Sequence, residues 1–267
     1  MRTGLSARTY LQFGAIVITT FFIICCGNTV NYNDLKDAFA ETENSSDTAI
    51  CPDSIFSLIP EYDSFIKPLS VSGRSFNKDV VVGISTQNEE LGIKQTCFLL
   101  GVYIADIGYV RHYEQVQLCM DYLEEMKSCA ARLSIPEELF NDVIVRSEAT
   151  LTSKEQLFAI ADSVVKNTSD YLEENELYGI SVIIAAGLWL ETYRIGIQLP
   201  LQRNDELMVN HMILLDQLIR ATGLVRNDQF IQKLNTSLVQ VQDAYNSNMP
   251  PEKLLEGIYE SLGISVH

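Results

Sequence analysis

After residue 52 the apolar residues of the chain recur at helical spacing, and the alternation typical of half-buried strands is nearly absent. Helix ends are also marked, because Ser134 and Glu137 have the spacing of a capping box and Gly263 falls where a helix should end. The pattern predicts eight helices, over residues 53–66, 88–132, 136–147, 153–174, 178–197, 205–222, 226–246 and 251–262. We therefore expect an all-α fold, a multi-helix bundle formed by residues 52–267.

Two places complicate this pattern. Gly92 and Gly101 are candidate breaks in the helix predicted over residues 88–132, because glycine weakens the interior of a helix. Segment 79–84 contains three consecutive valines and is the one place where β-branched residues favour a strand. A single strand would have no partner, so we expect no sheet to form there.

Two segments, residues 97–110 and 179–190, are apolar on nearly all sides. Each run is shorter than the roughly 20 residues that a membrane-spanning helix needs. A helix that is apolar all round must be covered by other elements, so both segments are predicted to be central helices of the bundle.

The two central segments also resemble each other. At an offset of 80 residues, identical residue types coincide at four positions, where Val102, Ile104, Ala105 and Tyr113 match Val182, Ile184, Ala185 and Tyr193. Similar apolar positions follow in the later helices. The matches predict an internal duplication into two related four-helix units, about residues 88–174 and 178–262. Chance similarity between apolar stretches is the alternative.

The N-terminus has the pattern of an export signal. Arg2 and Arg8 precede an apolar run over residues 10–24, which ends at Cys25 and Cys26. This arrangement resembles a bacterial lipoprotein signal, in which the cysteine after a small residue receives the lipid. We expect residues 1–25 to be the signal peptide and Cys26 to be the lipid attachment site. A plain signal peptide or an uncleaved anchor is the alternative.

The polar and acidic residues that follow predict a flexible, lipid-anchored tether over residues 26–51. Two or three acyl chains hold a soluble domain on a bilayer, so the expected partner of the N-terminus is a membrane. Removal of Arg2 and Arg8 with the signal would change the formal charge of the protein from −16 to −18. Such a surface repels phosphate backbones, and nucleic acid is therefore excluded as an expected partner.

The sequence contains no recognisable catalytic or metal-binding motif. The three histidines are scattered, and the cysteines lack metal-site spacing, so no metal and no cofactor are expected. Cys119 and Cys129 are about 15 Å apart along one helix, too far for a disulfide. Free buried thiols are the default, and a bridge between Cys51 and Cys97 is left open.

Charged and aromatic residues inside the two central segments are the candidate site. Asp106 shares a helical stripe with Tyr109, and Trp189 lies close to Glu191 along the second segment. A buried carboxylate is costly unless it is paired and hydrogen-bonded. These four residues therefore form either a structural polar network or a ligand pocket between the central helices. The first interpretation is favoured because buried polar groups nearly always find partners. In such a network tyrosine hydroxyls, arginines or helix ends would satisfy Asp106 and Glu191.

The sequences Leu100-Gly101-Val102-Tyr103, Ala105-Asp106-Ile107-Gly108-Tyr109 and, later, Gly187-Leu188-Trp189-Leu190-Glu191 resemble segments of a family of uncharacterised Bacteroidota envelope proteins. The resemblance implies a Bacteroidota source and an all-helical domain, and it brings no activity. We expect an outer-membrane-anchored envelope lipoprotein, with the periplasmic or surface face left open. Its expected function is a non-catalytic binding or scaffolding module. An envelope protein and a small molecule are the two candidate partners. The alternative is a small-ligand receptor or an envelope enzyme with a cleft between the central helices.

Overall fold

The computed structural model describes residues 75–84, 91–140, 154–198, 206–225 and 228–264. The predicted signal peptide, Cys26, the predicted tether and the predicted helix over residues 53–66 lie outside these residues. The described elements are η1 (Lys78–Val80), α5 (Ile93–His112), α6 (Val116–Arg132), α8 (Lys154–Glu174), α9 (Tyr178–Gln198), α10 (Glu206–Leu224), α11 (Gln229–Asn246) and α12 (Glu252–Leu262). The described residues contain no strand, and the predicted all-α bundle is confirmed.

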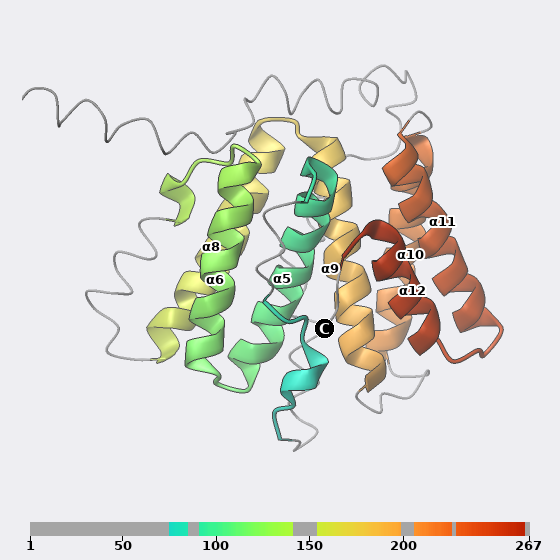
Figure 1. Cartoon of the computed structure of the whole chain (residues 1–267), viewed down its shortest axis with the longest axis horizontal. Helices are drawn as coiled ribbons and strands as arrows, with labels where there is room; N and C mark the ends of the chain where they lie inside the picture. Colours follow the sequence, from blue (N-terminus) through green and yellow to red (C-terminus); the bar gives the residue numbers. More distant parts are fainter. Residues whose placement is uncertain (1–74, 85–90, 141–153, 199–205, 226–227, 265–267) are drawn as a thin grey trace, which may run out of the picture.

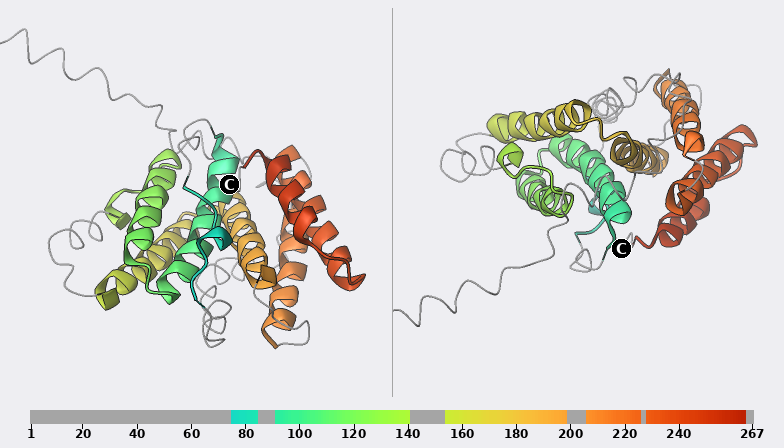
Figure 2. Two further views of the ribbon diagram at one scale, coloured as in Figure 1. Left: turned by 60° about the horizontal axis from the view of Figure 1, so that its bottom comes forward. Right: turned by 90° about the horizontal axis from the view of Figure 1, so that it is seen from above.

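Helices α5 and α9 form the centre of the bundle, with α6 and α8 on one side and α10, α11 and α12 on the other (Figure 1). The view from above in Figure 2 shows the same order. The central position of both helices, predicted from their apolar sequence, is confirmed. The two helices have 20 and 21 residues, long and apolar enough to cross a membrane, but 83% and 94% of their apolar windows are buried inside the fold.

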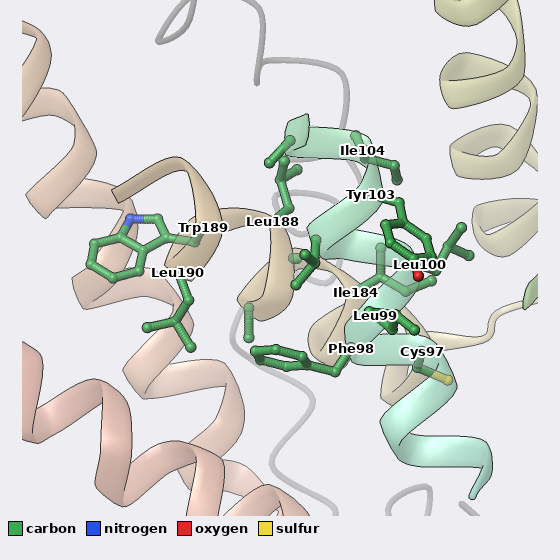
Figure 3. Packing of buried hydrophobic residues seen from close by; sticks show 14 of the residues in the cluster. Cys97, Phe98, Leu99, Leu100, Tyr103, Ile104, Ile184, Leu188, Trp189 and Leu190 are labelled. Carbon is green, nitrogen blue, oxygen red and sulfur yellow. The ribbon is translucent and has the colours of Figure 1, made fainter. Parts of the chain in front are cut away.

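The two central helices contact each other at glycine. A Cβ atom on Gly101 would lie 2.0 Å from the carbonyl oxygen of Ile184, and one on Gly187 would lie 2.2 Å from the carbonyl oxygen of Phe98. No side chain fits at such distances, so glycine alone allows this close approach of the two backbones. Figure 3 shows Phe98 and Ile184 at this contact, while Trp189 points away from α5. Helix α5 is continuous through Gly101, so the prediction of a helix break at this residue was wrong.

Helices α5 and α9 run in the same direction (Figure 1). Each of them contributes one glycine to their contact, and each glycine meets the backbone of the other helix. Gly101 contacts Ile184, and Gly187 contacts Phe98. Aligning Gly101 with Gly187 also aligns Phe98 with Ile184, because both pairs are 86 positions apart (187 − 101 and 184 − 98). At this register Gly101-Val102-Tyr103 matches Gly187-Leu188-Trp189, a glycine followed by an aliphatic and an aromatic residue. This register differs from the offset of 80 predicted from the sequence. The internal duplication itself stays a prediction.

The long helix predicted over residues 88–132 is two helices. α5 starts after Gly92, which was correctly marked as a break, and it ends at His112. Glu114 has a left-handed backbone with φ of 58°, and the N–H of Gln115 donates to the carbonyl oxygen of Val110 at 2.9 Å. This is a helix-ending motif that usually employs glycine. Because glutamate occupies the left-handed position, no glycine marks this helix end in the sequence.

The other helices agree with the predicted ranges to within a few residues. Gly263, with φ of 77°, ends α12 as predicted. Of the range 136–147, residues 138–140 are helical and residues 141–147 lie outside the described part. Cys97, Cys119 and Cys129 are free and buried, as expected by default, whereas Cys51 lies outside the described residues.

Candidate functional site

The valine segment that precedes α5 packs against α5, α6 and α9. We call residues 77–82 the strap. Residues 77–79 are exposed, Val80, Val81 and Val82 are 2%, 6% and 1% exposed, and Gly83 is again at the surface. A short 3₁₀ turn over Lys78–Val80 leads into extended backbone at Val81. The predicted absence of a sheet here agrees with the structure, in which side chains of the helices take the place of a partner strand.

Three of these helical side chains bind the buried end of the strap through its main chain. The N–H of Val82 donates to Oδ2 of Asp106 at 3.1 Å, and the carbonyl oxygen of Val82 accepts from the hydroxyl of Tyr122. The carbonyl oxygen of Val80 accepts from Nη2 of Arg194 at 2.5 Å. Asp106, Tyr122 and Arg194 come from α5, α6 and α9, so the strap joins three helices.

Arg194 is itself held by Glu191, one helical turn earlier on α9. Nε of Arg194 donates to Oε2 of Glu191 at 2.8 Å, and Nη2 donates to Oε1. The hydroxyl of Tyr259 on α12 donates to the same Oε2 atom at 2.6 Å. Glu191 is fully buried, and these bonds satisfy both of its carboxylate oxygens. They form a bidentate, charge-assisted pair of the kind that a buried carboxylate requires.

Asp106 has a different environment. It is fully buried, and its Oδ1 atom accepts no hydrogen bond from the donors of the described residues. Glu191 lies next to Asp106 within hydrogen-bonding reach, and two carboxylate groups can be linked only by a proton. Burial, and next the charge of Glu191, raise the pKa of Asp106 well above its usual range, against the opposing effect of Arg194. Burial and the neighbouring carboxylate thus favour the protonated form of Asp106, whose Oδ2 atom accepts from the N–H of Val82.

Tyr109 lies at the exposed end of the strap. Its hydroxyl accepts from the N–H of Asn77 at 3.3 Å and donates to the carbonyl oxygen of the same residue at 3.5 Å. Its ring contacts Phe76 and Tyr113, with ring centres 5.6 and 4.9 Å away. Tyr109 thus provides a fourth contact to the strap main chain.

Trp189 belongs to another part of the core. Its ring stacks on His211 of α10 with ring centres 4.4 Å apart, and Tyr193 stacks at 5.2 Å from Trp189. Nε1 of Trp189 donates to the carbonyl oxygen of His211 at 2.8 Å, and Nε2 of His211 lies 3.2 Å from the carbonyl oxygen of Trp189. Burial lowers the pKa of His211 to about 3. The imidazole is therefore neutral in this stack at physiological pH.

The structure thus brings together only part of the predicted site. Asp106 and Glu191 are neighbours, Tyr109 binds the same strap as Asp106, and Trp189 belongs to the contact between α9 and α10. Sequence reasoning missed Tyr122, Tyr259 and the strap main chain. A signal for the strap was present, because the three valines formed a segment that matched no helix and had no partner strand.

The chemistry of this polar cluster is that of hydrogen bonding to a polypeptide main chain. Among the described residues, no group of three or more histidine, cysteine, aspartate or glutamate side chains is arranged to hold a metal ion. No protein-family model matches the chain, and neither a curated protein nor a solved structure matches it.

Proposed function

We propose that the protein is an envelope lipoprotein, anchored in the outer membrane through Cys26, whose helical domain is a non-catalytic binding or scaffolding module. The non-catalytic role is supported by the candidate residues, which are buried and bind other parts of the fold. Asp106 and Glu191 are fully buried, and Trp189 is 4% exposed. Their hydrogen bonds go to the strap, to neighbouring side chains and to the main chain of α10.

A receptor or an enzyme with its cleft at these residues would need them to reach a soluble molecule. Trp189 is the only tryptophan of the chain, so its fluorescence reports this directly. For a scaffolding core we expect acrylamide to quench Trp189 in the folded protein far less than in the unfolded protein. Strong quenching in the folded state would favour the receptor or enzyme instead.

The membrane anchor is supported by the sequence before residue 27, where Cys26 follows an aliphatic run and the small residue Cys25. Cells that produce the full chain are labelled with a palmitate analogue, and the labelled protein is detected after membrane fractionation. Cys26→Ala should abolish the label and either release the protein from the membrane or leave the precursor uncleaved. Cys25→Ala is the matched control and should retain the label. If Cys26→Ala is still labelled, Cys26 is not the lipid attachment site.

A further inference from the structure

The strap is bound through its main chain and not through polar side chains. Asp106, Tyr122 and Arg194 contact the N–H or carbonyl groups of Val80 and Val82. Tyr109 contacts the main chain of Asn77 in the same way. Such bonds can form with any peptide of the same backbone conformation, so they provide affinity without reading the sequence.

Selectivity comes from the three valine side chains. Val80, Val81 and Val82 are buried in the hydrophobic core, whereas Lys78 and Asp79 before them and Gly83 after them are exposed. A peptide that binds here must therefore present three small aliphatic side chains in a row. The exposed residues Lys78, Asp79 and Gly83 impose no such requirement.

The binding groups are held by contacts that do not involve the strap. Glu191 fixes Arg194 through two hydrogen bonds, and Tyr259 of α12 fixes Glu191. Asp106 is fully buried beside Glu191. The close glycine contact joins α5, which carries Asp106, to α9, which carries Arg194. Groups positioned in this way lose little freedom when a peptide binds, which favours binding.

We infer that α5, α6 and α9 form a binding site for the main chain of a valine-rich peptide, and that the strap is a resident ligand which a second copy of the same peptide can replace. This inference deepens the proposed binding role and rests on it. Its test does not depend on lipid attachment, so a failure here leaves the Cys26 anchor untouched, and a failure of the Cys26 labelling leaves peptide binding untouched.

The test separates the strap from α5 without removing it. A site for a specific protease is inserted between Gln87 and Asn88 of the full chain, and a fluorescent synthetic peptide of residues 75–84 is added before or after cleavage. In the uncut chain the strap competes at a high effective concentration, so little peptide should bind. After cleavage the peptide should bind and displace the N-terminal fragment, which size-exclusion chromatography would show as a separate species.

Peptide variants test the proposed mode of binding. N-methylation of the Val82 amide removes the hydrogen donated to Asp106 and should weaken binding about tenfold or more, the expected effect of losing a buried hydrogen bond. Lys78→Ala in the peptide is the matched control and should bind as the original does, because Lys78 is exposed. Asp106→Leu in the cleaved chain should weaken binding of the original peptide in the same way.

Three results would overturn the inference. The first is a cleaved chain that stays helical by circular dichroism and binds no peptide. The second is equal binding of the N-methylated and original peptides, because the main-chain contacts would then be irrelevant. The third is a cleaved chain that unfolds and does not recover its helical signal with excess peptide. Recovery of that signal would support the inference.

Discussion

Asp106 shows how a single buried proton adjusts the stability of the protein. The raised pKa means that the folded protein binds this proton more tightly than the unfolded chain does. The stabilising contribution is therefore complete below the ordinary aspartate pKa and is lost as the pH rises from there toward the folded-state pKa. At neutral pH the neutral acid has a cost, which an uncharged side chain of the same shape would avoid.

Asp106→Asn should accordingly be tolerated, because the amide can accept from Val82 and donate to Glu191. We expect Asp106→Asn to melt at or above the wild-type temperature at pH 8, with the difference shrinking toward pH 4. Asp106→Leu leaves Val82 and Glu191 without this polar partner and should lower the free energy of unfolding by about 1–3 kcal/mol for each. Thermal melts across this pH range check both variants. An equally large loss in the two variants would mean that Asp106 is charged in the folded protein.

His211 gives a pH dependence of the opposite sign. Its folded-state pKa of about 3 lies below the ordinary value, so the unfolded chain takes up this proton first as the pH falls. The stabilisation is complete above about pH 6.5 and is lost between there and pH 3, by up to about 1.4 kcal/mol per pH unit. His211→Gln removes this titration. Urea unfolding from pH 6.5 to pH 4 should show a flatter loss of stability in the variant than in the wild type, and parallel curves would contradict the assignment.

At the residue scale, the sequence predicted that Asp106 and Glu191 would be satisfied by tyrosine hydroxyls, arginines or helix ends. Glu191 meets this prediction through Arg194 and Tyr259. Asp106 does not, because its Oδ2 atom accepts from a main-chain N–H that lies 24 residues upstream and its Oδ1 atom has no hydrogen-bond partner among the described residues. A main-chain donor has no signature in a sequence, so this partner could not have been found before the path of the strap was known.

At the scale of the helices, the contact between α5 and α9 sets the limits on sequence change. Gly101→Ala would place a Cβ atom 2.0 Å from a backbone oxygen, and a backbone atom cannot move aside as the end of a side chain can. We expect a loss of about 1–3 kcal/mol or more in the free energy of unfolding, measured by urea denaturation.

Gly257→Ala is the matched control within α12. A Cβ atom there meets nothing within 4 Å, and the residue is exposed in a helix interior. Alanine should therefore stabilise the protein by roughly 0.5–1 kcal/mol through its better helix propensity. The two substitutions are chemically identical and should have opposite signs. A neutral Gly101→Ala would show that the central helices are not in close contact.

The spacing of apolar residues predicted that the helices exist, but it did not predict where α5 ends. The predicted helix over residues 88–132 is interrupted because Glu114 adopts a left-handed conformation after α5. Ser134 and Glu176 do the same after α6 and α8. The left-handed conformation is unfavourable for these non-glycine residues, so tertiary packing must offset its energy cost. Residue propensities therefore predicted the helix end at Gly263 but not the helix end at Glu114.

At the scale of the whole molecule, the structure places one pair of parallel helices between two groups of helices. The sequence predicted the central position of these two helices, because residues 97–110 and 179–190 are apolar on nearly all sides. It did not predict the register, because an offset of 80 does not align Gly101 with Gly187, which lies 86 positions later. Short apolar stretches offer many chance matches, and only the backbone contact identifies which positions correspond.

The shared centre leads to a last prediction, that the described bundle unfolds as one cooperative unit. Trp189 lies in α9 and reports the packing of α10, while circular dichroism reports all helices. Met126 is fully buried in α6, on the other side of α5. Met126→Ala should cost about 2–5 kcal/mol and should shift the Trp189 fluorescence transition and the circular dichroism transition together. Leu238→Ala in α11 is the matched control from the opposite side and should shift both signals in the same way. If the two groups of helices were independent units, Met126→Ala would leave the Trp189 transition in place and split the circular dichroism curve into two steps.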